Sequence, residues 1–236
     1  IVAGVYASVG LGGGTSYTAL LAIFGASYRV IPGISLSLNL VVTLIGSINF
    51  ARQGHLRKEV IVPVLVASLP MSYLGGSLEV SARLFYWILL VTLVGVAARI
   101  YLWNGPSLQL DWSPTVERIV AAVVGAAIGL VGGLVGIGGG IYLIPALLLL
   151  GIADEKEAAA AGAVFTGLNS LTALLAHLQR QIPDLKMMAP LLAAVLVGGF
   201  VGSHLGSARF SAKTVRRALG VVILVAIGLL IHRLVF

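Results

Sequence analysis

Long runs of apolar residues, separated by short polar segments, cover the chain from end to end. Most runs reach about 20 residues, the length that an α-helix needs to cross the hydrocarbon core of a bilayer. In the first half they cover residues 1–24, 34–50, 60–78 and 82–103. In the second half they cover residues 119–150, 158–178, 187–205 and 215–231. The pattern predicts an all-α polytopic membrane protein.

The clearest polar segment divides the chain almost in half. Residues 104–114 include Asn, Gly, Pro, Ser, Gln and Asp, which favour turns and loops. We therefore expect a first repeat at residues 1–103, a linker at 104–114 and a second repeat at 115–236, together forming one integral membrane domain. A second polar group, Asp154 to Glu157, predicts the start of a helix with Asp154 as its N-cap.

A glycine motif occurs near the start of each half. Gly10-x-Gly12-Gly13-Gly14 lies 126 positions before Gly136-x-Gly138-Gly139-Gly140. A repeat of this length indicates two copies of one structural unit. Three consecutive glycines weaken a helix, because glycine loses more backbone entropy on folding than any other residue. The motif therefore predicts a helix break in each half; the alternative is that the glycines only permit close helix packing.

The broken segment of the second half is too long for one straight span. Residues 119–150 would form a helix roughly 48 Å long, whereas the hydrocarbon core is roughly 30 Å thick. We expect a re-entrant hairpin that turns at the glycines and returns to the side from which it entered. If both broken segments do this, each half crosses the membrane an odd number of times. The halves are then inverted repeats, each with one broken segment and three transmembrane helices.

Composition and charge agree with a membrane location. The chain is 59% hydrophobic and 10% charged, with a mean hydropathy of +1.07. We assign its net charge of +7 to loops that orient a membrane protein, and not to nucleic-acid binding. The hairpin topology places ten of the 15 basic residues on one face, which predicts that this face is cytoplasmic. The ten are Arg52, Arg57, Lys58, Arg99, Arg118, Lys156, Arg209, Lys213, Arg216 and Arg217. We expect the protein to lie in a bacterial-type cytoplasmic membrane.

The positions of the acidic residues indicate the charge of the substrate. All eight acids lie in or beside predicted loops, whereas cation carriers usually need a carboxylate inside the membrane. A helix that begins after Gly14 or Gly140 would present free N–H groups and a positive dipole end, which suit an anion. The chain has no cysteine, no His-Glu-x-x-His and no Gly-x-Ser-x-Gly. We therefore expect no metal site, no cofactor and no enzyme activity.

Polar residues on the helices after each motif are candidate substrate contacts. Amide and hydroxyl donors can hold an anion without the desolvation cost of a full charge, or they can form interhelical hydrogen bonds instead. His177 and His204 are candidates for a coupling proton, because histidine titrates near neutral pH. The predicted substrate contacts are Gly12, Gly13, Gly14, Thr15, Asn39, Thr43, Gly138, Gly139, Gly140, Ile141, Thr166, Asn169 and Ser170.

The paired glycine motifs, the second of which continues to Pro145, resemble the signature of the sulfite exporter TauE/SafE family of membrane permeases. The resemblance covers essentially the whole chain, although Ala19 stands where the second copy has Pro145. It implies a secondary transporter for a small anion such as sulfite, sulfoacetate or a related organosulfonate. A passive anion channel and a carrier for a carboxylate are the alternatives. The expected partners are the anion, the lipid bilayer and a coupling proton, with a homodimer as a further candidate.

Overall fold

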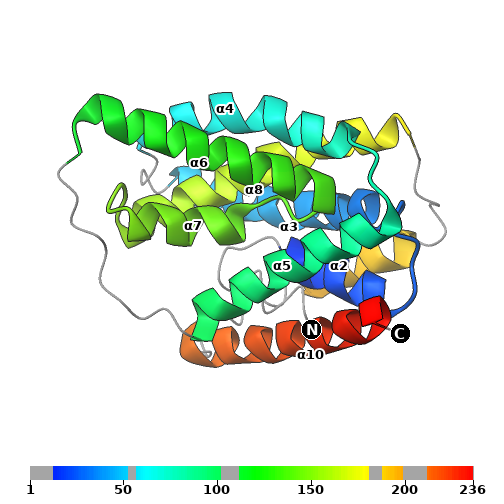
Figure 1. Ribbon diagram of the computed structural model, residues 1–236. Coiled ribbons are helices and arrows are strands. Elements are labelled where there is room, and N and C mark those ends of the chain that lie inside the picture. The colour runs from blue at the N-terminus through cyan, green and yellow to red at the C-terminus, as the bar shows by residue number, and fades with distance from the viewer. Residues whose placement is uncertain (1–12, 53–56, 102–111, 181–187, 199–211, 236) are drawn as a thin grey trace.

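A computed structural model describes residues 13–52, 57–101, 112–180, 188–198 and 212–235. These residues form helices and contain no strand, which confirms the predicted all-α class for the described part of the chain. The helices are α2 (Gly14–Ile23), α3 (Ile31–Arg52), α4 (Lys58–Ser77), α5 (Ala82–Tyr101), α6 (Pro114–Val135), α7 (Gly140–Leu149), α8 (Glu155–Leu178) and α10 (Ala212–Val235). A further helix covers Met188–Gly198. In Figure 1, α4, α6 and α8 lie on one side of the molecule and α5 and α10 on the other.

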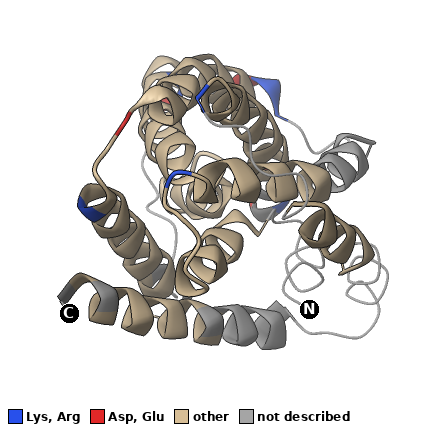
Figure 2. Ribbon diagram, turned by 90° about the vertical axis from the view of Figure 1, so that its right-hand side faces the viewer, with Lys and Arg blue, Asp and Glu red and all other residues tan. Residues whose placement is uncertain are grey.

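Three of the described helices are long and apolar enough to cross a membrane. They are α4, α6 and the Lys156–Leu178 part of α8. Large apolar side chains point outward, and Val66 on α4 and Val123 on α6 are 70% and 63% exposed. The few charged residues visible in Figure 2 lie in loops or near helix ends. Such an apolar exterior suits lipid, because a water-soluble helix carries polar residues on its outer face.

A stripe of glycines at four-residue spacing joins α6 to α4. An added Cβ at Gly129 would lie 2.6 Å from the carbonyl oxygen of Ser68, so the two backbones are in direct contact. Residue numbers rise together along both helices, which therefore run parallel. The facing pairs are Gly125 with Val64, Gly129 with Ser68 and Gly133 with Ser72.

Ionic contacts mark one end of the bundle. Arg57, just before α4, lies 3.2 Å from Glu117 of α6 and 4.0 Å from Glu157 of α8. We call this the Arg57 end. α8 runs parallel to α4, because Gly76 near the end of α4 packs on Ala173 in the last third of α8. The opposite end, where α8 finishes and α5 begins, is called the Arg180 end.

The chain reverses direction between α6 and α7. Gly136, Gly138 and Gly139 have φ values of 81°, 76° and 85°, in the left-handed region that favours glycine. An added Cβ at Gly139 would lie 2.7 Å from the Ile128 side chain, so the reversal lies beside α6. α7 then runs toward the Arg57 end, where the Trp112 indole N–H donates to the Leu150 carbonyl at 3.3 Å.

α2 occupies the same place in the first half as α7 does in the second. Both helices have 10 residues, begin 126 positions apart and follow a glycine with a φ of 85°. The start of α2 meets the reversal, since a Cβ added at Gly14 would collide with the Ile137 carbonyl. α2 ends beside the loop that carries Arg29, at the Arg180 end. The two short helices thus start together and run to opposite ends of the bundle.

The glycine stripe predicts a position-specific effect of a single methyl group. Gly129→Ala should separate α6 from α4 and lower the free energy of unfolding by about 1 to 3 kcal/mol, as overpacking does. Gly95 of α5 is the matched control, because nothing lies within 4 Å of its added Cβ. Gly95→Ala should leave stability unchanged or raise it by up to about 1 kcal/mol. Thermal unfolding in detergent checks both, and equal melting temperatures would contradict the close backbone contact.

The reversal predicts that two further glycine substitutions lower stability by different amounts. Gly139→Ala adds a methyl group both at positive φ and against Ile128 and Phe165. Gly25→Ala tests positive φ alone, because Gly25 has a φ of 79° with open space around it. The φ strain costs about 1 to 2 kcal/mol, and overpacking adds about 1 to 3 kcal/mol at Gly139 only. The melting temperature of Gly139→Ala should therefore lie well below that of Gly25→Ala; the reverse order would rule out the described packing of the reversal.

Candidate functional site

A group of buried, uncharged polar residues surrounds the reversal of the chain. Each member is at most 4% exposed, and no charged side chain is among the buried residues that the structure describes. We call this group the polar centre. Its members are Thr15, Ser16, Thr18, Ser35, Asn39, Thr43, Ser68, Ser72, Thr166, Asn169 and Ser170.

Hydroxyl groups connect the start of α2 to the reversal. Thr18 donates to the Ser35 hydroxyl at 2.8 Å and lies 3.3 Å from the Gly136 carbonyl oxygen. Ser35 in turn donates to the Gly14 carbonyl at 3.1 Å. One chain of hydrogen bonds thus holds α2, α3 and the turn after α6 together.

Asn39 of α3 links the two halves of the chain. Its amide nitrogen donates to the Ser170 hydroxyl at 2.8 Å and to the Ile137 carbonyl at 3.4 Å. Gly138 fits between them, because a Cβ there would collide with Asn39 and Ser170. Thr43 donates to the Asn39 carbonyl within its own helix at 2.8 Å. The structure therefore brings Asn39, Gly138 and Ser170 together.

Asn169 faces a different helix from Ser170. Its amide nitrogen donates to the Ser68 hydroxyl of α4 at 3.0 Å and to the Phe165 carbonyl at 2.9 Å. Ser72 donates to the Asn169 carbonyl at 2.9 Å. The amide donors of both asparagines are therefore occupied, while both side-chain oxygens are buried without a partner among the described residues. An anion could accept a hydrogen bond from one of these amide groups only if that amide gave up a hydrogen bond to a protein oxygen.

The two short helices begin in the polar centre without a side-chain cap. Thr166, which contacts Gly140, donates instead to the Gly162 carbonyl at 2.6 Å. By contrast, the start of α8 has a capping box in which Asp154 and Glu157 satisfy each other's backbone N–H groups, as the sequence predicted for Asp154. Uncapped N–H groups and the positive dipole end of a helix favour negative charge.

Most of the predicted contacts line this centre. Gly13, Gly14, Thr15, Gly138, Gly139 and Gly140 are buried there with the polar residues of α3 and α8, and Ile141 is half-buried. Gly12 and His204 lie outside the described residues. His177 is not a member of the polar centre, and its Nε2 is 2.9 Å from the Gly133 carbonyl oxygen. A carbonyl only accepts, so Nε2 carries a hydrogen.

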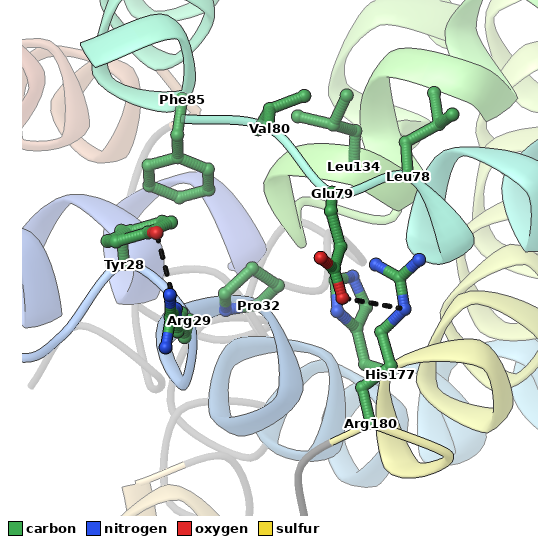
Figure 3. Close-up of a pocket in the computed structure, with 10 residues that line it drawn as sticks. All are labelled: Tyr28, Arg29, Pro32, Leu78, Glu79, Val80, Phe85, Leu134, His177 and Arg180. Carbon is green, nitrogen blue, oxygen red and sulfur yellow. Dashed lines mark hydrogen bonds and ion pairs between the residues drawn. The ribbon is translucent and has the colours of Figure 1, made fainter. Parts of the chain in front are cut away.

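A pocket of about 300 Å³ opens at the Arg180 end and was not predicted from the sequence (Figure 3). Its charged and titratable residues come from three distant segments: Tyr28 and Arg29 before α3, Glu79 before α5, and His177 and Arg180 at the end of α8. No motif connects loop residues so far apart in sequence. The only signal in the sequence was the five basic residues that the hairpin topology leaves on the face opposite the ten, which are Arg29, Arg83, Arg180, Lys186 and Arg233.

Positive charge exceeds negative charge in this pocket. Arg180 Nε lies 3.9 Å from a carboxylate oxygen of Glu79, whose side chain is 83% exposed. Arg29 donates from Nε to the Tyr28 hydroxyl at 3.2 Å. This hydrogen bond raises the pKa of the Arg29 guanidinium. Two arginines face one glutamate.

Known proteins resemble the chain over nearly its full length. The family described as Sulfite exporter TauE/SafE matches residues 1–230. A relative described as "Probable membrane transporter protein y4hK", from Sinorhizobium fredii (strain NBRC 101917 / NGR234), is 30% identical over 230 residues. That match covers 96% of this chain and 92% of the relative. No solved structure matches the chain.

The family match agrees with the fold. Residues 1–230 include both glycine motifs and all but the end of α10, so the match does not rest on one half. An apolar exterior and helices long enough to cross a bilayer are what a membrane transporter requires. The chain therefore belongs to the sulfite exporter TauE/SafE family of membrane transporters.

Proposed function

We propose that the protein is a secondary transporter that carries a small anion, such as sulfite, sulfoacetate or a related organosulfonate, across the cytoplasmic membrane. The observation that carries this proposal is the composition of the polar centre, where the described side chains are all uncharged and two uncapped helices begin. A cation carrier would need a buried carboxylate. Helix starts and hydroxyls instead stabilise negative charge.

The proposed binding position lies between the starts of α2 and α7, near the membrane midplane. Hydroxyls such as those of Thr166 and Ser170 can rotate to donate to an anion, since a hydroxyl both donates and accepts. Asn39 and Asn169 would contribute by exchanging a protein acceptor for the anion. Gly14 is in contact with the Ile137 carbonyl, so substrate must separate α2 from the reversal. Relative movement of two repeats supplies such a separation in other transporters.

The directions of the helices support inverted repeats. α2 and α7 start together and run to opposite ends, and α3 runs from the Arg180 end toward the Arg57 end while α8 runs the other way. α10 begins at the Arg57 end, where α5 finishes, because Gly220 packs on the Tyr101 ring. We propose that residues 1–103 and 115–236 form these repeats around the linker at 104–114. The positive-inside rule then makes the Arg57 end cytoplasmic.

Cysteine labelling tests this topology, because the natural chain has no cysteine. Lys156 at the Arg57 end and Ser81 at the Arg180 end are both exposed. In intact cells an impermeant thiol reagent should label Ser81→Cys and not Lys156→Cys, which should react only after the membrane is opened. Labelling of both positions from outside would exclude the proposed arrangement.

Uptake into proteoliposomes tests the substrate. We expect saturable uptake of sulfite or sulfoacetate with counterflow, whereas a passive channel would show neither, and uptake of lactate in their place would favour the carboxylate alternative. Ser170→Ala should raise KM about 10-fold if its hydroxyl donates to a charged ligand. Thr172→Val is the matched control on α8, because among the described residues Thr172 bonds only to carbonyls of its own helix. Failure to transport any of these anions would refute the proposal.

His177 is the proposed carrier of a coupling proton. With Nε2 held by Gly133, a second proton would bind Nδ1, and the charged residues of the pocket around it are Arg29, Glu79 and Arg180. Glutamine can keep an N–H donor toward Gly133 but cannot take a proton. His177→Gln should therefore retain transport and lose its acceleration by a pH gradient. If transport by His177→Gln still responds to the gradient, His177 does not carry the coupling proton. His204→Gln tests the second candidate histidine in the same way.

A further inference from the structure

The pocket at the Arg180 end is separate from the polar centre. We propose that it is an anion-binding vestibule in which Arg29 and Arg180 hold a small oxyanion with a short apolar group. Glu79 competes with that oxyanion for Arg180. This inference rests on the proposed anion transport and adds the place where the substrate is first selected.

The pocket borders the reversal of the chain. Pro32, in its wall, contacts Gly136, because a Cβ added at Gly136 would collide with Pro32. Behind Gly136, the Thr18 hydroxyl lies 3.3 Å from the Gly136 carbonyl oxygen. An anion in the pocket is thus one layer of residues from the polar centre. Movement of Pro32 away from Gly136 would open the way between them.

Both arginines keep guanidinium N–H groups that can bind a ligand. Among the residues that the structure describes, Arg29 makes no ion pair. Its Nε donates to the Tyr28 hydroxyl, and its Cζ lies 5.7 Å from the centroid of the Tyr28 ring. Arg180 pairs with Glu79 at 3.9 Å, a long contact to a highly exposed carboxylate, and exposed pairs of this kind contribute little stability. A guanidinium can form two parallel hydrogen bonds to an oxyanion. Figure 3 shows the two arginines on opposite sides of the pocket with Pro32 between them.

The apolar walls of the pocket indicate the chemistry of the uncharged part of the ligand. Leu134, Val80 and Phe85 line the pocket beside the charged groups, so one part of a ligand meets arginine and another meets hydrocarbon. A bare inorganic ion would use only the first part. An organosulfonate or small carboxylate uses both, since burial of its apolar group adds a favourable contribution.

Binding of methanesulfonate to the full-length protein in nanodiscs tests the vestibule, with uncharged dimethyl sulfone as the control ligand. Arg180→Gln should weaken methanesulfonate binding about 10-fold, because it removes a charge-assisted hydrogen bond. Glu79→Gln should strengthen binding about 3-fold, because it removes the competing carboxylate. Arg83→Gln is the matched control: Arg83 is exposed at the same end of the molecule but does not line the pocket.

Transport by the same variants separates this inference from the proposed function. Arg180→Gln should raise KM and Glu79→Gln should lower it, with kcat unchanged in both. If both variants bind and transport like Arg83→Gln while the natural protein transports anions, the vestibule is wrong and the proposed function stands. If dimethyl sulfone binds as tightly as methanesulfonate, the pocket does not recognise charge and the vestibule is likewise wrong. Absence of anion transport by the natural protein would instead refute the function itself.

Discussion

Direct contact between helix backbones is the constraint on which this structure depends. Lipid is as apolar as leucine, so helices in a membrane associate through close packing and hydrogen bonds and not through burial from water. Gly129 and its neighbours let α6 touch α4, and Gly76 does the same between α4 and α8. The three parallel helices then form a fixed wall. The reversal after α6 lies against this wall, at the side of Ile128.

The same lack of side chains makes room for the polar centre. Gly138 fits between Asn39 and Ser170 only because it has no Cβ. The hydroxyls and amides around it are mostly bonded to one another and to backbone carbonyls, so the centre is stable without a ligand. A substrate would replace internal hydrogen bonds with its own and would therefore gain only the difference between them. The proposed carrier would need such an arrangement, because it favours release as much as capture.

The sequence predicted the features that depend on local pattern. Helix bounds followed apolar runs, the 126-residue offset recurred in α2 and α7, and Asp154 formed its cap. The sequence did not predict which neighbouring helix each side chain faces. Asn169 and Ser170 are adjacent, yet Asn169 faces α4 and Ser170 faces α3. The pocket was also missed, because loop residues such as Arg29 and Arg180 meet only after the whole chain has folded.

The most extensive helix contact, between α4 and α6, joins opposite halves of the chain, so it cannot form until α6 has been made. α4 is made and inserted before α6 exists, so Ser68 and Ser72 at first face lipid or one another with no helix to cover them. Asn169, which bonds to Ser68, arrives later still. Until α6 and α8 are inserted, this surface of α4 therefore lacks the helices that cover it in the folded protein.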